Sequence, residues 1–497
     1  MTAKTLMIQG SSSSAGKSLV TTALCRIFAR RGLKVAPFKA QNMSNNAAVC
    51  PDGSEIGRAQ ALQAFAAGAA LSSDLNPILI KPEADMRSQV VVNGRPFKSV
   101  NAIDYYTDKK TLWEHAAAAL DRLRAHYDLV IIEGAGSPVE LNLKAGDIVN
   151  MAIARYAHAP VFLVGDIDRG GIFAQLLGTL WLLEPEERRL LRGFIINKFR
   201  GDMRLFDDGI HILEEKSGLP VLGVVPYLKD LNLPDEDAVS VEVASLSAKP
   251  ASAFETDIAV LAFPRIANAD DFDSLRAEPG VHIRHVTSAR ELGNPQAVIL
   301  PGTKSTMADL DWMRQTGLAE AVIHFAKNGG EVVGICGGYQ MLGKSIRDPL
   351  HVESQKDSVN GLGLLSMVTT FAAQKSTYQV QAKVLNFKSL AGEIIEGYEI
   401  HMGETESQAS WLEITNRNSQ AVEVRDGSVS PDGKVWGCYL HGLFHNDVLR
   451  YAWLQSLGWK GKGISQSEDF LESLETLANA VEESLDMKKL EEIVWEN

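Results

Sequence analysis

A cysteine framed by glycines is the feature of this sequence with the clearest chemistry. Residues 331–341 read EVVGICGGYQM, which predicts a buried strand, a tight turn at Gly334, Cys336 and Gly338, and then a helix. The turn lifts the Cys336 side chain out of the sheet, and the positive end of the following helix favours its thiolate. Gly337 lets a substrate approach the backbone. We therefore interpret Cys336 as a nucleophile rather than as a buried structural cysteine.

A cysteine nucleophile needs a base, and several histidines lie downstream of this turn. We choose His441, which stands on a turn at the end of a predicted strand, with His401 and His445 as the alternatives. The glycine turn at Gly302 follows another predicted strand. Its backbone N–H would join that of Gly337 in an oxyanion hole, where the two would stabilise the negative charge of a tetrahedral intermediate.

A phosphate-binding loop is predicted near the N-terminus, between a short apolar strand at 5–9 and a helical stretch at 19–31. Its backbone N–H groups would cradle phosphate oxygens, Lys17 would neutralise phosphate charge and Ser18 would ligate magnesium. Five residues separate the two glycines of the loop, where the standard pattern has four. The predicted nucleotide-binding residues of this loop are Ser14, Gly16, Lys17 and Ser18.

Polar residues also follow other strands, at the edge where parallel sheets bind ligands. Glu133 ends the continuous apolar strand 128–133 beside glycines, which is the position of a magnesium-binding carboxylate. Asn197 ends the strand 191–197 and is placed to contact the edge of adenine. The candidates for contact with a substrate or with a transferred phosphoryl group are Lys39, Gln41, Asn42, Asn45, Asp166 and Arg169.

The order of the elements predicts an α/β protein with two doubly wound, mainly parallel sheets, because strands alternate with helices. We expect an ATP-binding domain over 1–234, a linker over 235–253, where the sequence turns acidic and then Ala/Ser-rich, and a second domain over 254–497. Residues 467–494 have apolar positions at helical spacing. They predict a tail of two amphipathic helices that closes the second domain.

Composition narrows the class of protein. The 497 residues carry a net charge of -13 with no basic block, which argues against nucleic acid as the main partner. The four cysteines lack the spacing of a disulfide framework or a zinc site, which fits a reducing cytoplasm. The sequence has no signal-peptide pattern and no apolar run long enough to span a bilayer. We therefore expect a cytoplasmic enzyme that acts on small molecules and has no membrane partner. The sequence leaves the oligomeric state of the protein open.

These motifs resemble known families. The phosphate loop and the Glu133 strand end resemble dethiobiotin synthetase-like ATPases, and Cys336 with His441 resembles a class I-like glutamine amidotransferase domain. Together with further motifs, they make nearly the whole chain similar to the cobyrinic/cobyric acid amidotransferase family. These further motifs are PFKAQNMSNN at 37–46, DIDRGG at 166–171, LPGTKST at 300–306 and YEIHMGET at 398–405. The resemblance implies a P-loop ATPase domain followed by a class I-like glutamine amidotransferase domain.

The resemblance also implies an activity in cobalamin biosynthesis. ATP, magnesium and L-glutamine would be used to amidate the b, d, e and g carboxylates of a corrinoid, adenosylcobyrinic acid a,c-diamide, giving adenosylcobyric acid. Cys336 would form a thioester with glutamine while His441 shuttles the proton. One position departs from typical class I domains, which have Glu two residues after the histidine, because Leu443 stands there. Glu399 and Glu404 are the candidates for orienting His441.

Two other functions are compatible with parts of the sequence. A related enzyme would amidate the a and c carboxylates of cobyrinic acid, but the PFKAQNMSNN motif argues against it. A partitioning-type ATPase switch would bind a partner without amide chemistry. Such switches carry a lysine early in the phosphate loop, where serines stand here, and they have no need of a Cys–His half. The presence of Cys336 and His441 also speaks against a second domain that serves only as a scaffold.

Overall fold

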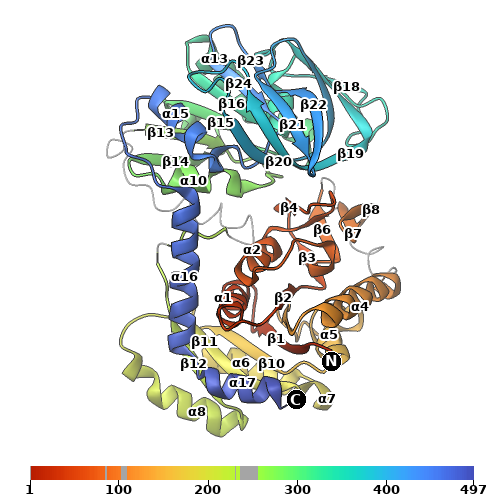
Figure 1. The fold of residues 1–497 in the computed structure, drawn as a ribbon, viewed down its shortest axis with the longest axis vertical. Helices are drawn as coiled ribbons and strands as arrows, with labels where there is room; N and C mark the ends of the chain where they lie inside the picture. Colours follow the sequence, from red (N-terminus) through yellow and green to blue (C-terminus); the bar gives the residue numbers. More distant parts are fainter. Residues whose placement is uncertain (1, 84–86, 102–108, 230, 235–255, 497) are drawn as a thin grey trace.

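The computed structural model describes residues 2–83, 87–101, 109–229, 231–234 and 256–496, and it shows two α/β units stacked on each other (Figure 1). The first is built on a parallel sheet in the order β12-β11-β10-β1-β9-β2. All residues of β9 and β10 are buried, as in a sheet that helices cover on both faces. The strands are β1 (Lys4–Gly10), β2 (Val35–Phe38), β9 (Leu129–Glu133), β10 (Val161–Asp166), β11 (Leu191–Phe199) and β12 (Val221–Pro226). The helices are α1 (Lys17–Arg30), α2 (Arg58–Ala67), α4 (Lys109–His126), α5 (Met151–Ala157), α6 (Ile172–Leu182), α7 (Pro185–Arg188) and α8 (Asp207–Ser217).

A smaller sheet lies between the main sheet of the first domain and the second domain (Figure 1). Its strand order is β3-β6-β7-β8, and a two-stranded hairpin of β4 and β5 stands beside it. The strands are β3 (Gln41–Met43), β4 (Ala47–Val49), β5 (Glu55–Gly57), β6 (Ile78–Pro82), β7 (Arg87–Val92) and β8 (Arg95–Asn101).

The second domain has its own sheet in the order β14-β13-β15-β16-β24-β23, which is parallel except for the last pair. The prediction of two doubly wound, mainly parallel sheets is therefore confirmed. The strands are β13 (Thr256–Leu261), β14 (Val281–Val286), β15 (Ala297–Leu300), β16 (Glu331–Ile335), β23 (Ser428–Val429) and β24 (Val435–Cys438). The helices are η6 (Ala269–Phe272), α10 (Asp273–Ala277), α11 (Ala289–Leu292), α12 (Thr306–Gln315), α13 (Leu318–Lys327), α14 (Gly337–Leu342), η7 (Leu443–His445) and α15 (Asp447–Ser456).

A further, mainly antiparallel sheet packs beside the parallel sheet of the second domain and was not expected. Its two long strands, β19 and β20, pair over most of their length. They also contact the first domain, because Lys375 pairs with Glu55 at 2.7 Å and Gln379 donates to the carbonyl of Val49 at 2.7 Å. The strands are β17 (Ser345–Arg347), β18 (Ser358–Asn360), β19 (Met367–Val384), β20 (Ile394–Ser407), β21 (Leu412–Arg417) and β22 (Gln420–Asp426).

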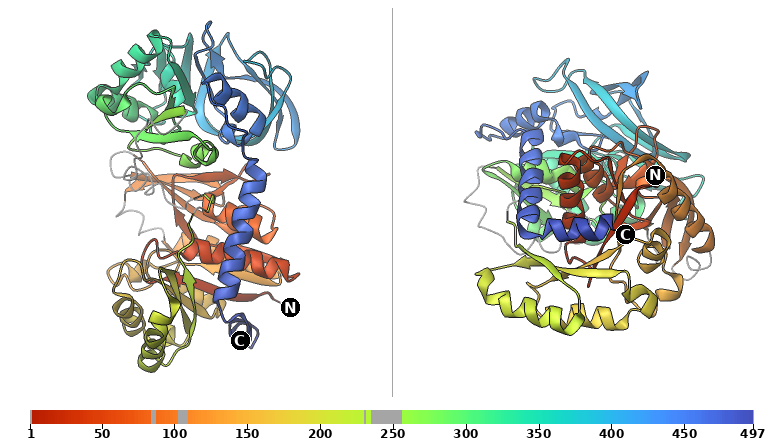
Figure 2. Two further views of the ribbon diagram at one scale, coloured as in Figure 1. Left: turned by 90° about the vertical axis from the view of Figure 1, so that its left-hand side faces the viewer. Right: turned by 60° about the horizontal axis from the view of Figure 1, so that its bottom comes forward.

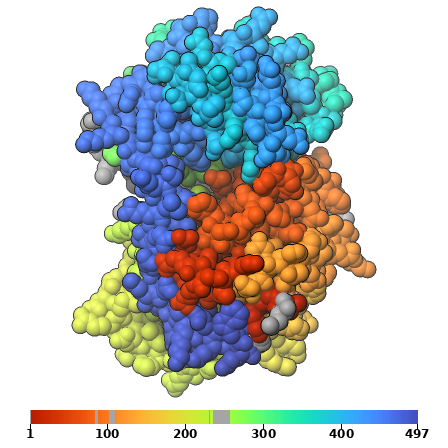
Figure 3. Space-filling view, viewed as in Figure 1, coloured from red at the N-terminus to blue at the C-terminus, as the bar shows by residue number. Residues whose placement is uncertain are grey.

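The C-terminal helices α16 (Gln466–Ser484) and α17 (Met487–Trp495) do not close the second domain, as the sequence suggested, but pack on the first. In two views α16 leaves the second domain and runs down the side of the first (Figure 2), and the surface view shows both helices lying against its face (Figure 3). Leu474 and Leu477 join the core around Phe28 of α1. The amphipathic pattern predicted a buried face but not its partner. The proposed linker, 235–253, lies outside the described residues.

None of the helices in the described part of the chain is both long and apolar enough to cross a membrane.

The packing of α16 predicts a stability effect. Leu477 is 1% exposed, so Leu477→Ala leaves a cavity in the core of the first domain and should lower its free energy of unfolding by about 2–5 kcal/mol. Leu471→Ala, on the same helix at a position 43% exposed, should change it by less than about 0.5 kcal/mol. Urea unfolding followed by circular dichroism compares the two. Equal midpoints for both variants would show that α16 does not contribute to this core.

Candidate active sites

The turn around Cys336 has the strained geometry of a nucleophile elbow. Cys336 follows β16 and precedes α14, with φ 49° and ψ -109°, a backbone conformation that residues with a side chain rarely adopt. A Cβ on Gly338 would come within 2.0 Å of the carbonyl oxygen of Leu300, so the turn can close only with glycine there. The Cys336 Sγ lies 3.6 Å from the carbonyl oxygen of Ile400. The turn holds the thiol at the end of the sheet, which is the position predicted from the sequence.

His441 lies beside Cys336 and is oriented by a carboxylate. Its Nδ1 is 2.7 Å from Oδ2 of Asp271, and the other oxygen of Asp271 accepts the backbone N–H of Gly442 at 2.7 Å. Burial alone would lower the pKa of His441, but the charge of the Asp271 carboxylate, the charge of Cys336 and the hydrogen bonds to both residues raise this pKa to about 10. Both His441 and Asp271 are 1% exposed. Cys336, His441 and Asp271 therefore form a buried nucleophile–base–acid constellation.

Neither of the two expected partners of His441 orients it. Glu399 instead pairs with Arg417 at 2.7 Å and contacts His401 at 3.3 Å, while Glu404 is exposed on β20. A chain segment 170 residues upstream supplies the carboxylate. The run Asn-Ala-Asp-Asp-Phe-Asp at 268–273, just after a strand, was the available signal, but spacing alone does not show which strand ends meet.

The two other histidines have different surroundings. His401 stacks on Tyr439, with ring centroids 3.8 Å apart, and its Nδ1 contacts the carbonyl of Gly403 at 2.8 Å. His445 lines a different cavity from Cys336, and burial and the nearby Arg58 lower its pKa.

The two glycines expected to form an oxyanion hole lie close to this constellation. A Cβ on Gly302 would come 2.8 Å from Cε1 of His441, and a Cβ on Gly337 would come 2.7 Å from Cγ2 of Thr303. The glycine turn and the elbow are therefore packed against each other without room for side chains, and their role in binding an oxyanion stays a prediction.

A cavity of about 490 Å³ opens over Cys336 and His441. Residues of both domains line it, because Lys81 and Gln89 of the small sheet face the elbow across the domain boundary. Asn45 lies here rather than with the phosphate loop, and its buried Oδ1 has no hydrogen-bond partner among the described residues. A small polar molecule bound over Cys336 would touch both domains.

The predicted phosphate loop forms a second site, at the carboxyl edge of the first sheet. Lys17 donates to the carbonyls of Ser12 at 3.1 Å and Gly136 at 3.2 Å. Glu133 is fully buried and gathers several side chains: Ser18 Oγ lies 2.9 Å and Lys39 Nζ 2.9 Å from its Oε1. Gln63 of α2 donates to its other oxygen. The structure thus gathers Ser18, predicted to bind metal, and Lys39, predicted to contact a phosphoryl group, around the carboxylate of Glu133.

A cavity of about 500 Å³ lies beside this cluster and is lined by Ser14, Lys17, Lys39, Gln41 and Asn42. Gly16 has φ 97°, and a Cβ there would come 2.0 Å from the amide nitrogen of Asn197, which donates to the carbonyl of Ala15 at 2.9 Å. Asn197 therefore braces the loop, and its contact with adenine stays a prediction.

Two other predicted residues lie apart from this cavity. Asp166 pairs with Lys198 at 2.9 Å, and Lys198 also donates to the carbonyl of Ser14 at 2.6 Å. The exposed Arg169 lies 3.7 Å from Asp166. Asp166 is therefore linked to the phosphate loop through Lys198, and neither residue lines the cavity.

The small sheet is the wall between the two cavities. Ile80, Ser88 and Val100 line the cavity of the phosphate loop. The neighbouring residues Lys81, Gln89 and Ser99 line the cavity of the elbow. Successive residues of a strand point to opposite faces, so one layer of backbone separates the sites.

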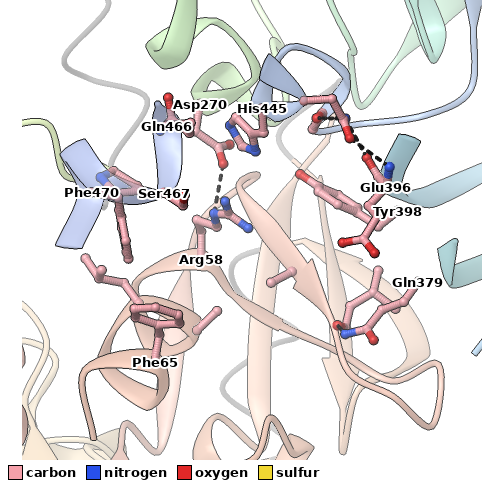
Figure 4. A pocket seen from close by; sticks show the side chains of 18 of the residues that line it. Arg58, Phe65, Asp270, Gln379, Glu396, Tyr398, His445, Gln466, Ser467 and Phe470 are labelled. Atoms are coloured by element: carbon pink, nitrogen blue, oxygen red, sulfur yellow. Dashed lines mark hydrogen bonds and ion pairs between the residues drawn. The ribbon is translucent and has the colours of Figure 1, made fainter. Parts of the chain in front are cut away.

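The domains are docked through the segment that carries Asp271. Asn268 accepts the N–H of Ala47 at 3.0 Å, and Asp270 pairs with Arg58 of α2 at 2.8 Å. This pair lines a third cavity, about 1030 Å³ in volume. Figure 4 shows the pair with His445 beside it, between Phe65 and Phe470 on the left and Tyr398 on the right. Tyr398 also stacks on His441, with ring centroids 5.2 Å apart. The residues next to Asp271, the acid that orients His441, are thus held by contacts with both domains.

Comparison with known families agrees with this division of the chain. Residues 6–241 match the family model of the CobQ/CobB/MinD/ParA nucleotide binding domain, and residues 257–449 match that of the CobB/CobQ-like glutamine amidotransferase domain. The protein is therefore an ATP- and glutamine-using enzyme, an amidotransferase joined to a nucleotide-binding domain.

Full-length relatives make the class more specific. The chain is 55% identical over 473 residues to the cobyric acid synthase of Roseiflexus castenholzii, covering 94% of this chain and 95% of that one. It is 51% identical to that of Herpetosiphon aurantiacus and 47% identical to that of Dehalococcoides mccartyi strain CBDB1, with 99% of both chains covered in each case. The chain belongs to the cobyric acid synthase family. The two alternative functions, an enzyme that amidates the a and c carboxylates and a partitioning-type ATPase switch, are therefore set aside.

The triad geometry predicts the effect of removing the acid. Asp271→Asn should lower the kcat of glutamine hydrolysis by about a hundredfold to ten-thousandfold, because the neutral amide no longer fixes the proton on Nδ1 or stabilises the imidazolium. The pKa of His441 should fall, since Asp271 is a cause that raises it. Asp273→Asn is the matched control, because Asp273 pairs with Arg276 on the surface of the same segment. A kcat of hydrolysis in Asp271→Asn equal to that of the control would contradict the assignment.

Proposed function

We propose that the second domain releases ammonia from L-glutamine in the cavity over Cys336. The Cys336 sulfur attacks the side-chain amide carbon, His441 takes the thiol proton and passes it to the leaving nitrogen, and ammonia departs from a thioester. Gly302 and Gly337 supply the oxyanion-hole N–H groups. Water then hydrolyses the thioester to glutamate. The observation that carries this proposal is the buried Cys336–His441–Asp271 constellation in a cavity that also borders the ATP-using domain.

We propose that the first domain activates a carboxylate with ATP. The substrate carboxylate attacks the γ-phosphorus and ADP leaves, which gives an acyl phosphate. Ammonia then attacks the acyl carbon, and inorganic phosphate leaves with the C–O bond electrons and takes up the proton that the nitrogen loses, so that an amide remains. Lys17 and Lys39 are placed to neutralise the phosphoryl oxygens in the cavity that they line. Gln41 and Asn42 are candidates for holding the carboxylate.

Magnesium fits the oxygens at the end of β9. Ser18 Oγ and Glu133 Oε1 lie 2.9 Å apart, and Mg²⁺ in nucleotide sites is bound by one or two protein oxygens with phosphate and water completing its shell. The ion would neutralise phosphate charge there. Lys39, which contacts Glu133, would then be free to turn toward the phosphoryl group.

Ammonia has to pass the wall formed by the small sheet. The β3 edge of that sheet joins the two cavities along the chain, since Gln41 and Asn42 line one cavity and Asn45 lines the other. We propose that ammonia crosses at this edge, where the Oδ1 of Asn45, which has no hydrogen-bond partner among the described residues, can accept one of its N–H groups.

We propose that the acceptor is adenosylcobyrinic acid a,c-diamide, amidated at b, d, e and g to adenosylcobyric acid. The support is the family membership, because the named relatives are cobyric acid synthases. We further propose boundaries of 1–234 and 254–497 for the two domains, a cytoplasmic location, and no nucleic-acid or membrane partner.

Comparing glutamine with free ammonium as the nitrogen source tests the separate roles proposed for the two domains. Cys336→Ala should lose glutamine-dependent amidation and keep ATP-dependent amidation from ammonium, because only the ammonia source is removed. The product is measured by mass spectrometry of the corrinoid.

Cys438→Ala is the matched control, since Cys438 is a buried free cysteine on the neighbouring strand and does not line the cavity. It should keep both activities. If Cys336→Ala lost ammonium-driven amidation as well, while the control kept it, Cys336 would not be confined to glutamine hydrolysis.

A further inference from the structure

Two lysines and one glutamate form a buried cluster beside the cavity over Cys336. Glu55 of β5 is 1% exposed and pairs with Lys81 of β6 and, at 2.7 Å, with Lys375 of β19. The side chains of Lys81 and Lys375 are 5% and 10% exposed. Both lysines line the cavity, whereas Glu55 does not. The two domains thus bring a pair of buried cations to the site of the nucleophile.

The cluster has one more positive charge than it has negative charge. Burial alone would raise the pKa of Glu55, but the two lysines lower this pKa to about 2, so the glutamate is ionised at neutral pH. Burial lowers the pKa of Lys375, and Lys81 lowers it further against the opposing effect of Glu55, to about 8. In the described part of the chain, Glu55 is the one acid that pairs with either lysine. A buried cation without a full counter-charge is unfavourable, so an anion in the cavity would stabilise this cluster.

The other lysine and arginine side chains that line this cavity have their charges balanced in other ways. Lys304 pairs with Glu83 at 3.2 Å, and Lys356 pairs with Asp311. Arg87 is exposed, so water and salt ions can balance its charge. The buried cluster is therefore the part of the cavity wall that best fits an anionic group of a ligand.

The strand that carries Lys375 runs beside the strand that contacts the nucleophile. The Cys336 Sγ is 3.6 Å from the carbonyl oxygen of Ile400, and Ile400 pairs with Thr377, two residues from Lys375. Neighbouring strands are about 4.8 Å apart. An extended glutamine spans about 5 Å from its side-chain amide carbon to its α-carboxylate carbon. A glutamine with its amide carbon at Sγ can therefore direct its α-carboxylate toward the lysines.

We propose that Lys81 and Lys375 bind the α-carboxylate of L-glutamine and so determine the specificity of the glutaminase site. The two ammonium groups then lie between two carboxylates, that of Glu55 and that of the substrate, and the charges balance. An amide without a neighbouring carboxylate leaves the lysines unmatched and binds weakly. The site therefore takes glutamine and rejects other amides, including those that the enzyme itself makes. This inference rests on the proposed function.

Removing one lysine at a time tests the cluster without leaving a lone buried charge. In Lys375→Met and in Lys81→Met, Glu55 keeps the other lysine, so the ion pair that remains is balanced. Lys375→Arg keeps the positive charge. Lys304→Met is the matched control, because Lys304 lines the same cavity but already pairs with Glu83.

The measurement is the kcat and KM for hydrolysis of the side-chain amide in L-glutamine and in L-glutaminamide, in which a neutral amide replaces the α-carboxylate. ATP, magnesium and adenosylcobyrinic acid a,c-diamide are present throughout, and chromatography separates the products, glutamate and its α-amide. The kcat/KM of the unmodified protein, Lys304→Met and Lys375→Arg should be about a hundredfold or more higher for glutamine. Lys375→Met and Lys81→Met should each raise KM for glutamine about tenfold or more, because a charged hydrogen bond is lost. Their kcat for glutamine and their kcat/KM for L-glutaminamide should stay within about threefold, since the α-carboxylate takes no part in the attack on the amide.

A preference for glutamine in Lys375→Met and Lys81→Met equal to that of the unmodified protein would overturn the proposal. So would an unmodified protein that hydrolyses both compounds equally well. An equal loss of kcat/KM with both compounds would also overturn it, because the lysines would then support the structure and not the α-carboxylate. Failure of the proposed function would look different, because the unmodified protein would then hydrolyse neither compound.

Discussion

The hydrogen bond between Asp271 and His441 is the interaction on which the amidotransferase site depends. It fixes the tautomer of the base, and it holds His441 against the strained turn of Cys336. The acid belongs to a segment whose preceding residues, 268–270, are bonded to the first domain. The segment that carries the acid of this reactive centre is therefore held in place partly by contacts with the other domain.

The rest of the molecule keeps that docking in place. The helices α16 and α17 continue from the second domain and bury their apolar face in the core of the first, so the two units share one hydrophobic cluster as well as an interface. Between the sites stands the thin sheet β3-β6-β7-β8, each face of which belongs to one cavity. The two sites are close but separate, which suits a reaction that produces ammonia in one and uses it in the other.

Local patterns in the sequence predicted the parts of the sites that local geometry determines. The glycines around Cys336 and the loop before Lys17 are needed for backbone turns, so they could be read directly. Asp271 could not, because it meets His441 only after strands from distant parts of the chain have been ordered in a sheet. For the same reason the helical period of α16 showed that one face is buried but not that Phe28 covers it. The long strand β19 was missed because much of its alternation is half-exposed.

The most direct test of the whole account follows nitrogen from glutamine to the corrinoid. The protein is incubated with adenosylcobyrinic acid a,c-diamide, ATP, magnesium and glutamine that carries heavy nitrogen in its side-chain amide, and the corrinoid is analysed by mass spectrometry and fragmentation. The account predicts labelled amides at the b, d, e and g positions, formed stepwise and absent when ATP is omitted. Hydrolysis of glutamine with an unchanged corrinoid, or label confined to other carboxylates, would contradict it.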